Sequence, residues 1–403
     1  MFRKFITALI FAASPAVAQN PNDLTLSFVN SSLSKTETTL AAATNPTPTE
    51  KFALGAVRFL RGIEKTLQLR YRHNAVLRDF DLPVLRLTVP PNPNPEPFYY
   101  GLIADLFERV DQDMDFAREA LFGIGEGDDV GLVVDLAGVW FDINSNDTRD
   151  AGESLFEIGV DVLGVGLGSQ DSGTLPQSLK IRFDTADAAW LRAYTHVLSG
   201  VSDLVIAFDP TEMIAKVADA NQKLRAIKGE NFAERFSFLS SQEANVDMFA
   251  MVYGAINVIP DATLTRSARQ HFLAMVNENR DFWRQVPLET DNDMEWLPND
   301  TQTSAFGVDL PAGTSEIWLS VLNDGEAVLR GELLIPHWRT EPGGGINLAK
   351  LMDNPVQVDI VTWVHGYGLL PAMESGPLAS TDSLRDFDRM FGGDAALFAF
   401  WLN

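Results

Sequence analysis

The chain of 403 residues contains no cysteine. That absence excludes disulfides, thiolate metal sites, a thiol nucleophile and attachment of a lipid through cysteine. An exported protein without disulfides needs a hydrophobic core of its own, and a chain of this length can bury one. Hydrophobic residues make up 46% of the chain and charged residues 21%, which is typical of a globular rather than a disordered protein.

Cations are scarce. The chain has 31 Lys and Arg against 55 Asp and Glu, which gives a formal net charge of −24. A surface of this sign repels phosphate backbones and anionic lipid, so we expect neither nucleic acid nor an anionic membrane surface as a partner. The same charge favours solubility and the uptake of cations. A protein or small-molecule partner is not identified by these features.

Long apolar runs are also missing after the N-terminus, so we expect no membrane span and a soluble mature protein. Residues 1–18 have the three regions of a secretory signal: Arg3 and Lys4, an apolar run over 5–13, and small residues at 16–18 before Gln19. The sequence therefore predicts export, to the periplasm or the outside, with a mature chain from residue 19.

Common catalytic motifs are absent. There is no H-E-x-x-H zinc motif and no G-x-S-x-G nucleophile turn. The glycine cluster at 123–127 lacks the Lys-Ser/Thr ending of a phosphate loop and is flanked by acids, so we interpret it as a helix-ending turn. The five histidines include no pair with zinc spacing. We interpret His196 and His271 as packed helix residues, and we note that His337 and His365 lie in Trp-rich segments.

Apolar residues recur at helical spacing through most of the chain. The predicted long helices are residues 50–73, 99–122, 184–208, 211–228, 240–258, 265–283 and 316–329. Strands are few: 81–89 and 179–183 are candidates, and 130–140 is either a strand or an entering helix. The Gly- and Ser-rich segment 164–178 is a predicted linker between an N-terminal helical region, 19–163, and a C-terminal helical region, 179–403. The predicted fold class is a mainly α, multi-helix globular protein with a few short strands.

One stretch carries chemistry in its spacing. Ca²⁺ takes six to eight oxygen ligands, and a twelve-residue loop supplies them from positions 1, 3, 5, 7, 9 and 12. Counting from Asp142, those positions hold oxygen-bearing residues throughout, and the residue at position 7 uses its backbone carbonyl. The predicted calcium ligands are Asp142, Asn144, Asn146, Thr148, Asp150 and Glu153.

This loop resembles the calcium loops of EF-hand and dockerin proteins, over residues 142–153 only. It departs from their pattern at Asp147, where position 6 is usually Gly because the backbone there is left-handed. It departs again at Arg149, where paired EF-hands carry an apolar residue. No second loop of this quality follows, and Asn144 and Asn146 leave only three formal ligand charges. The resemblance therefore implies a solitary, weak site, with Kd in the range of about 10⁻⁴ to 10⁻³ M. Long helical stretches elsewhere resemble exported bacterial proteins of unknown function. The alternative for the loop is an ordinary surface turn rich in Asn and Asp.

A second acidic stretch, residues 289–295, could hold another cation, but runs of charge are usually solvated and we expect a solvated loop. Our leading hypothesis is an exported helical protein with one structural calcium loop and no catalysis of its own. The alternative is a periplasmic hydrolase or ligand-binding protein with a Trp- and His-lined cleft in the C-terminal half. It requires His337 and His365 to meet in a pocket with a carboxylate. A third possibility, an interaction scaffold, would show as a large exposed apolar patch.

Overall fold

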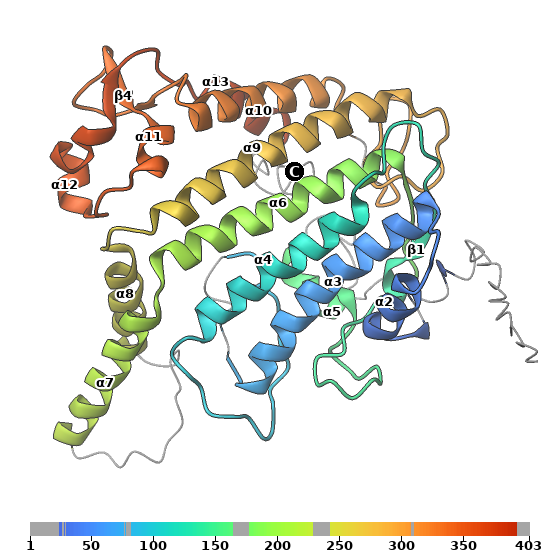
Figure 1. Cartoon of the computed structure of the whole chain (residues 1–403), viewed down its shortest axis with the longest axis horizontal. Helices are drawn as coiled ribbons and strands as arrows, with labels where there is room; N and C mark the ends of the chain where they lie inside the picture. The colour runs from blue at the N-terminus through green and yellow to red at the C-terminus, as the bar shows by residue number, and fades with distance from the viewer. Residues whose placement is uncertain are drawn as a thin grey trace, which may run out of the picture.

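The computed structural model describes residues 24–25, 28, 30–75, 77, 82–163, 177–228, 242–307 and 310–392. Most of these residues are helical, and the strands are few and short (Figure 1). The predicted mainly α fold class is therefore confirmed. The predicted signal, residues 1–18, lies outside the described residues.

Four long helices lie side by side and form the body of the molecule: α3 (Pro48–Arg72), α4 (Leu102–Leu121), α6 (Thr185–Phe208) and α9 (Ala262–Gln285) (Figure 1). Local sequence explains where two of them begin. Thr47 and Glu50 form a reciprocal capping box at the start of α3, with Pro48 in its first turn. Asp184 and Asp187 form the same arrangement at the start of α6. The long periodic segments of the sequence were thus predicted correctly to within a few residues.

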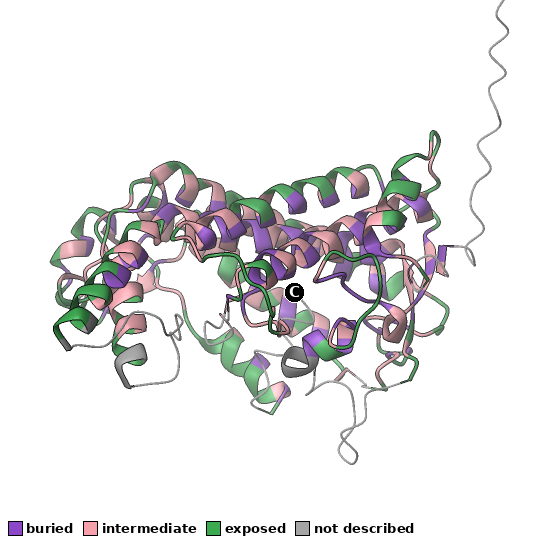
Figure 2. Ribbon diagram, turned by 90° about the horizontal axis from the view of Figure 1, so that it is seen from below, coloured by how far each residue is buried: buried purple, intermediate pink, exposed green. Residues whose placement is uncertain are grey.

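Glycines set how closely these helices approach. A Cβ at Gly55 of α3 would lie 2.5 Å from the Leu121 side chain of α4. A Cβ at Gly200 of α6 would lie 2.7 Å from the ring of Phe272 on α9. Figure 2 shows that the buried residues gather where the long helices face one another. Among the described residues, the core therefore runs between the helices rather than inside a sheet.

A short antiparallel ribbon crosses the N-terminal end of α6. Strand β1 (Gly131–Asp135) pairs with β2 (Lys180–Asp184), with Gly131 opposite Asp184. The segment 130–140 is thus a strand followed by a 3₁₀ turn, η1 (Leu136–Gly138). Most of the predicted linker, residues 164–176, lies outside the described residues. The elements on its two sides pack together, through this ribbon and through α4 against α6.

The predicted strand at 81–89 was wrong, because residues 82–87 form turns and bends. Val84 has a left-handed backbone (φ 60°) and its carbonyl accepts a 2.9 Å hydrogen bond from the buried guanidinium of Arg70. A buried guanidinium requires acceptors. The turn leaves the Val84 carbonyl free to accept from Arg70, whereas in a regular strand this carbonyl would pair with a neighbouring strand.

The remaining elements surround this body. They are α2 (Leu33–Ala41), α5 (Leu155–Leu163), α7 (Thr211–Lys228), α8 (Gln242–Ile256), η2 (Val286–Leu288), α10 (Thr314–Arg330), α11 (Leu348–Asp353), α12 (Ile360–His365), η3 (Tyr367–Ala372) and α13 (Asp382–Met390). A small sheet in the order β3–β4–β5 joins Ile335–Pro336, Gly344–Ile346 and Met373–Ser375. Among the described helices, none combines the length and apolar character needed to cross a membrane.

Candidate metal centres

The predicted calcium loop is closed at its base by backbone pairing. Trp140 and Ser154 form an antiparallel bridge, and the Phe141 N–H donates to the Glu153 carbonyl at 2.8 Å. The chain therefore leaves and returns at one point, and residues 142–153 form a compact loop between β1 and α5. All six predicted ligands lie in it.

Side-chain oxygens at loop positions 1, 3 and 5 accept hydrogen bonds from the loop backbone. The Asp142 carboxylate accepts from the N–H groups of Asn146 and Asp147, both at 2.9 Å. Asn144 Oδ1 accepts from the Asn146 N–H at 3.1 Å, and Asn146 Oδ1 from the Thr148 N–H at 2.7 Å. These contacts are the local turns that Asx residues favour, and they coil the loop around its own polar side chains.

Position 6 adopts the backbone conformation that the resemblance implies. Asp147 has φ 60°, in the left-handed region where glycine is the usual residue. Its carboxylate leaves the loop and contacts α2, accepting from Ser32 Oγ at 2.9 Å and pairing with Lys35 at 3.4 Å. The Ser32 hydrogen bond and the Lys35 charge lower the pKa of Asp147. Glycine could not make either contact.

Glu153, at position 12, is 1% exposed and turned into the loop. Its carboxylate accepts from the N–H of Ile143 at 2.9 Å and from the N–H of Asp150 at 2.8 Å. Burial raises the pKa of Glu153, and these hydrogen bonds act against that rise. A carboxylate thus lies at the position where the predicted site needs its two-oxygen ligand.

Asp150 and Thr148 are exposed. The Asp150 carboxylate accepts from the side-chain amides of Asn144 at 2.7 Å and Asn146 at 2.8 Å, which lower its pKa. The oxygens of Asp142, Asp150 and Glu153 do not all come within 4.8 Å of one another. Closing around an ion would require Asp150 to exchange its amide partners for the cation.

Helix α3 holds the loop at its first position. Glu64 Oε1 accepts from the Asp142 N–H at 2.7 Å, and Gln68 Nε2 donates to the Asp142 carbonyl at 2.7 Å. Glu64 is fully buried and paired with Arg61. Burial raises its pKa, while the Arg61 charge opposes the rise. Sequence patterns gave no sign of this support, because it joins residues far apart in the chain.

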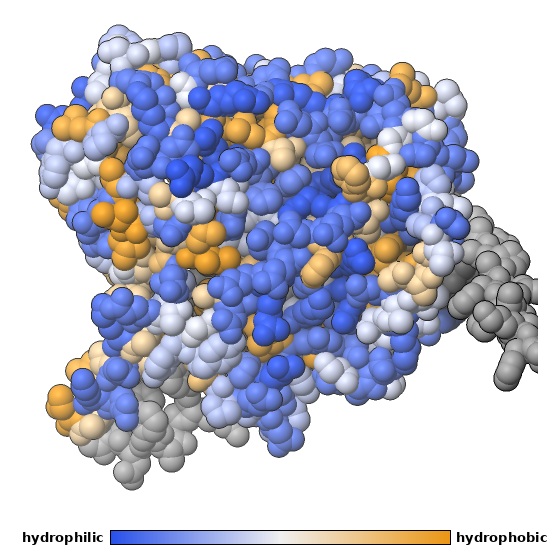
Figure 3. All heavy atoms as spheres, in the orientation of Figure 1, coloured by the Kyte–Doolittle hydropathy of each residue, from blue (hydrophilic) through white to orange (hydrophobic). Residues whose placement is uncertain are grey.

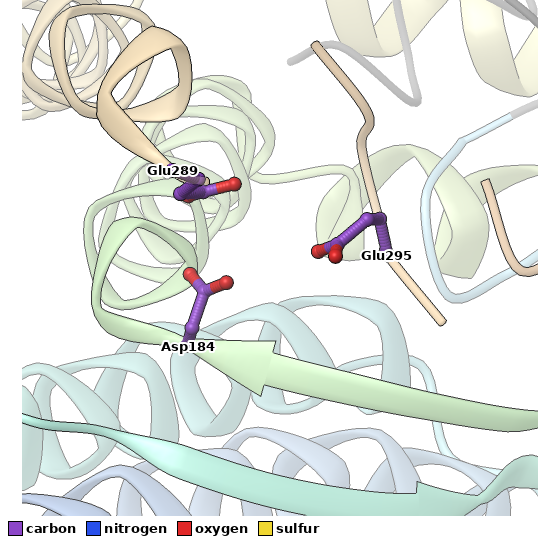
Figure 4. Close-up of side chains that lie close together, drawn as sticks. All are labelled: Asp184, Glu289 and Glu295. Atoms are coloured by element: carbon purple, nitrogen blue, oxygen red, sulfur yellow. The ribbon is translucent and has the colours of Figure 1, made fainter. Parts of the chain in front are cut away.

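A second group of acidic side chains meets at the start of α6 (Figure 4). Asp184 caps α6, Glu289 follows η2, and Glu295 comes from the loop after it. Oxygens of these three side chains lie within 4.8 Å of one another. A pocket of about 210 Å³ includes Asp184 and Glu289 in its lining. Asp184 is distant in sequence from the acidic stretch 289–295, so no local pattern connects them.

Backbone contacts bring these distant segments together. The Arg182 N–H of β2 donates to the Met294 carbonyl at 3.1 Å, and Ala305 N–H donates to the Glu295 carbonyl at 2.8 Å. Asn299 Nδ2 donates to the carbonyl of Glu289 at 3.3 Å. The end of the 289–295 stretch therefore joins β2 through a single bridge between Arg182 and Glu295, and Glu295 is only 2% exposed.

Burial and mutual repulsion disfavour ionisation of this cluster. Burial, followed by the charge of Asp184, raises the pKa of Glu289 to about 9. Burial also raises the pKa values of Asp184 and Glu295, and of the neighbouring Asp187. Arg182 lies 3.8 Å from Asp184 but closer, at 3.2 Å, to the exposed Asp291.

Either a shared proton or a bound cation relieves such repulsion. We interpret the raised pKa values of Asp184 and Glu289 as a proton shared within the cluster. The expected solvated loop holds for Asp291 and Asp293, which are exposed. It was wrong for Glu289 and Glu295, because the fold places both side chains against β2 and α6.

The two histidines of the hydrolase alternative have separate ring contacts. His337 Nε2 contacts the Trp363 carbonyl at 3.1 Å, and its Nδ1 accepts from the Arg339 N–H at 3.3 Å. The ring of His365 packs against Tyr367. Within the part of the chain that the structure describes, no carboxylate bonds to either ring, and the two residues form no catalytic arrangement.

Exposed apolar side chains gather on two parts of the surface. Ile360, Val361 and Val364 are exposed on α12, and Leu224 and Ile227 near the end of α7. Figure 3 shows apolar patches on an otherwise largely polar face. Nothing in the described residues identifies what would cover them.

Comparisons with known proteins add no family. No protein-family model matches the chain, and neither curated proteins nor solved structures gave a significant match.

Proposed function

We propose that the protein binds one Ca²⁺ ion through residues 142–153, as a structural ion of an exported helical protein. The observation that carries the proposal is the agreement between ligand spacing and loop conformation. Oxygen-bearing residues occupy all six ligand positions, and Asp147 has the left-handed backbone at position 6. An ordinary Asx turn requires neither feature at those places.

The donor set suits a hard cation. Carboxylate, amide and carbonyl oxygens are ligands for Ca²⁺, and no nitrogen or sulfur ligand lies among the six residues. Asp142, Asp150 and Glu153 provide the three formal charges. This low charge, and the need for Asp150 to leave its amide partners, support weak binding of about 10⁻⁴ to 10⁻³ M.

The structural role follows from what the loop contacts. Its first residue is held by Glu64 and Gln68 of α3, its sixth by Ser32 and Lys35 of α2, and its last leads into α5. An ion at the centre would tie these three helices to one point. The conclusion is stabilisation of the N-terminal part rather than catalysis.

The test is chemical unfolding of the full chain with millimolar calcium and then with chelator. A ligand that binds only the folded state stabilises it by RT ln(1 + [L]/Kd), about 1.4 kcal/mol at ten times Kd. We expect that gain in the native protein and its loss in Asp150→Ala. The Asp150 side chain is exposed and contacts only the Asn144 and Asn146 amides of the loop, and the substitution keeps the Asp150 N–H bond to Glu153, so this variant should fold. Glu153→Gln should also remove the calcium response, with a loss of basal stability as well.

The matched control is Asp293→Ala, which removes an exposed carboxylate outside the loop. It should keep the full calcium response. Equal responses in Asp150→Ala and Asp293→Ala would refute the proposed site. Absence of any response in the native protein at about 10 mM calcium, well above the expected Kd, would refute calcium binding altogether.

A further inference from the structure

Two histidines that are far apart in the sequence meet between helices α6 and α9. His196 of α6 and His271 of α9 face each other with their Nδ1 atoms 2.8 Å apart. Their ring centroids are 5.1 Å apart, which is the nitrogen separation plus roughly one ring radius on each side. The two Nδ1 lone-pair directions therefore lie nearly on one line.

That head-on arrangement suits a hydrogen bond rather than a metal. Two ligands of one ion direct their lone pairs at a common point to one side, whereas these point at each other. One ring must donate an Nδ1–H and the other must accept with a bare Nδ1, so the two rings have different tautomers.

Asp203 decides which ring donates. It lies on α6, is 3% exposed, and its Oδ2 accepts no hydrogen bond from the described residues. That oxygen is 3.9 Å from His271 Nε2. A proton on Nε2 of His271 would face the carboxylate, so His271 carries Nε2–H and accepts at Nδ1. His196 is then the Nδ1–H donor.

Charged groups from the packed helices surround the pair: Arg118 opposes an extra proton on either ring, whereas Asp111 and Asp115 favour one on His271. Helix α4 contributes Asp111, Asp115 and Arg118, and Arg118 bonds to Ser199 at 3.0 Å. Helix α6 adds Arg192, which is paired with Glu278 of α9 at 2.8 Å. Burial, and then the Arg118 charge, lowers the pKa of His196 to about 3, and burial lowers that of His271.

We propose that the His196–His271 pair is an acid-sensitive latch between α6 and α9. In the neutral state a single hydrogen bond joins the two helices. A first extra proton can enter only at Nε2 of His196, which leaves that bond intact but places a charge beside Arg118. A second would have to enter at Nδ1 of His271, where it would meet the Nδ1–H of His196 and break the contact.

The direction of the pH dependence follows. Both histidines have a lower pKa folded than their ordinary value near 6.5, so the unfolded chain takes up protons first. The stability they contribute is present above about pH 6.5 and is lost as the pH falls toward the folded values. Asp203 acts in the opposite direction, because burial raises its pKa to about 6 and the folded state then gains a proton there. The proton uptake of the two histidines on unfolding exceeds the proton release of Asp203, so the net stability falls as the pH falls.

The first measurement is nitrogen-15 NMR of histidine side chains in the full chain near neutral pH. We expect one buried ring in the Nδ1–H form and one in the Nε2–H form, with a hydrogen-bonded Nδ1 proton. Two Nε2–H rings would overturn the latch, because neither could then donate to the other. This readout needs no variant.

The second measurement compares unfolding at about pH 7.5 and about pH 5. Each proton bound only by the unfolded chain changes the unfolding constant about tenfold per pH unit. In His196→Asn the amide can still donate to His271 but cannot titrate. The change in the unfolding constant per pH unit should therefore be smaller than in the native protein by up to about tenfold. The control is His365→Asn, because His365 is an exposed residue at the end of α12. Equal pH dependence in the native protein and His196→Asn would refute the latch.

Discussion

At the scale of single residues, Asp147 is the most informative departure from the calcium-loop pattern. A left-handed backbone costs a non-glycine residue about 1–2 kcal/mol. The Ser32 hydrogen bond and the exposed Lys35 pair act against this cost. The residue's main consequence is to connect the loop with α2.

Replacing Asp147 by Gly should change global stability little, because the relief of backbone strain and the loss of the two contacts act in opposite directions. It should also speed hydrogen exchange across α2, residues 33–41, because both contacts with the loop are lost. Hydrogen-exchange mass spectrometry measures this directly. Asp147→Asn is the matched control, since it keeps an acceptor for Ser32 and tolerates the same backbone. Unchanged exchange in α2 for the glycine variant would show that the contact does not hold that helix.

For Glu289, replacing the ionisable side chain by a neutral one should stabilise the folded protein. Its pKa is raised to about 9, so the folded state retains a proton that the unfolded chain loses near pH 4.5. The stability that this group contributes is present below pH 4.5 and is lost as the pH rises toward 9. Glu289→Gln should stabilise the protein near pH 8 by about 1–2 kcal/mol, roughly one pKa unit.

Urea unfolding at about pH 8 and about pH 5 tests this, and the gain should shrink at the lower pH. Asp291→Asn is the control, because this carboxylate is exposed and pairs with Arg182. Its removal should not stabilise the protein. A Glu289→Gln variant that is equally stable or less stable at pH 8 would contradict the shared-proton assignment.

At the scale of elements, the α6–α9 interface depends on a residue without a side chain. Gly200→Ala would place a Cβ 2.7 Å from the ring of Phe272. Overpacking of this kind costs about 1–3 kcal/mol, which exceeds the gain of about 0.5–1 kcal/mol from replacing a helical glycine. We expect a net loss of stability, measured as a lower urea midpoint.

The matched control lies in α10. Gly325 is also in a helix interior, but a Cβ there would meet nothing within 4 Å. Gly325→Ala should stabilise the protein by about 0.5–1 kcal/mol. Opposite signs for the two alanine substitutions would separate packing from helix propensity. A gain in both would show that Phe272 rotates away at little cost.

At the scale of the whole molecule, chain segments from both sides of the predicted linker form one packed body. Strand β1 pairs with β2, and α4 packs on α6. The proposed calcium loop is held by α2 and α3, whereas the acidic cluster lies beside strand β2. The two acidic regions are therefore separate features with separate tests, although both follow from the acid-rich composition.

The helices and the ligand spacing of the proposed calcium loop could be predicted from local patterns. Apolar periodicity, capping residues and Asx turns act over a few positions, so residues such as Thr47, Asp184 and Asp147 could be interpreted locally. Long-range packing brings Asp184 to Glu289 and Glu295, His196 to His271, and Glu64 to Asp142. Each of these contacts joins distant segments, and the shifted acidity there arises from burial, which local sequence does not reveal.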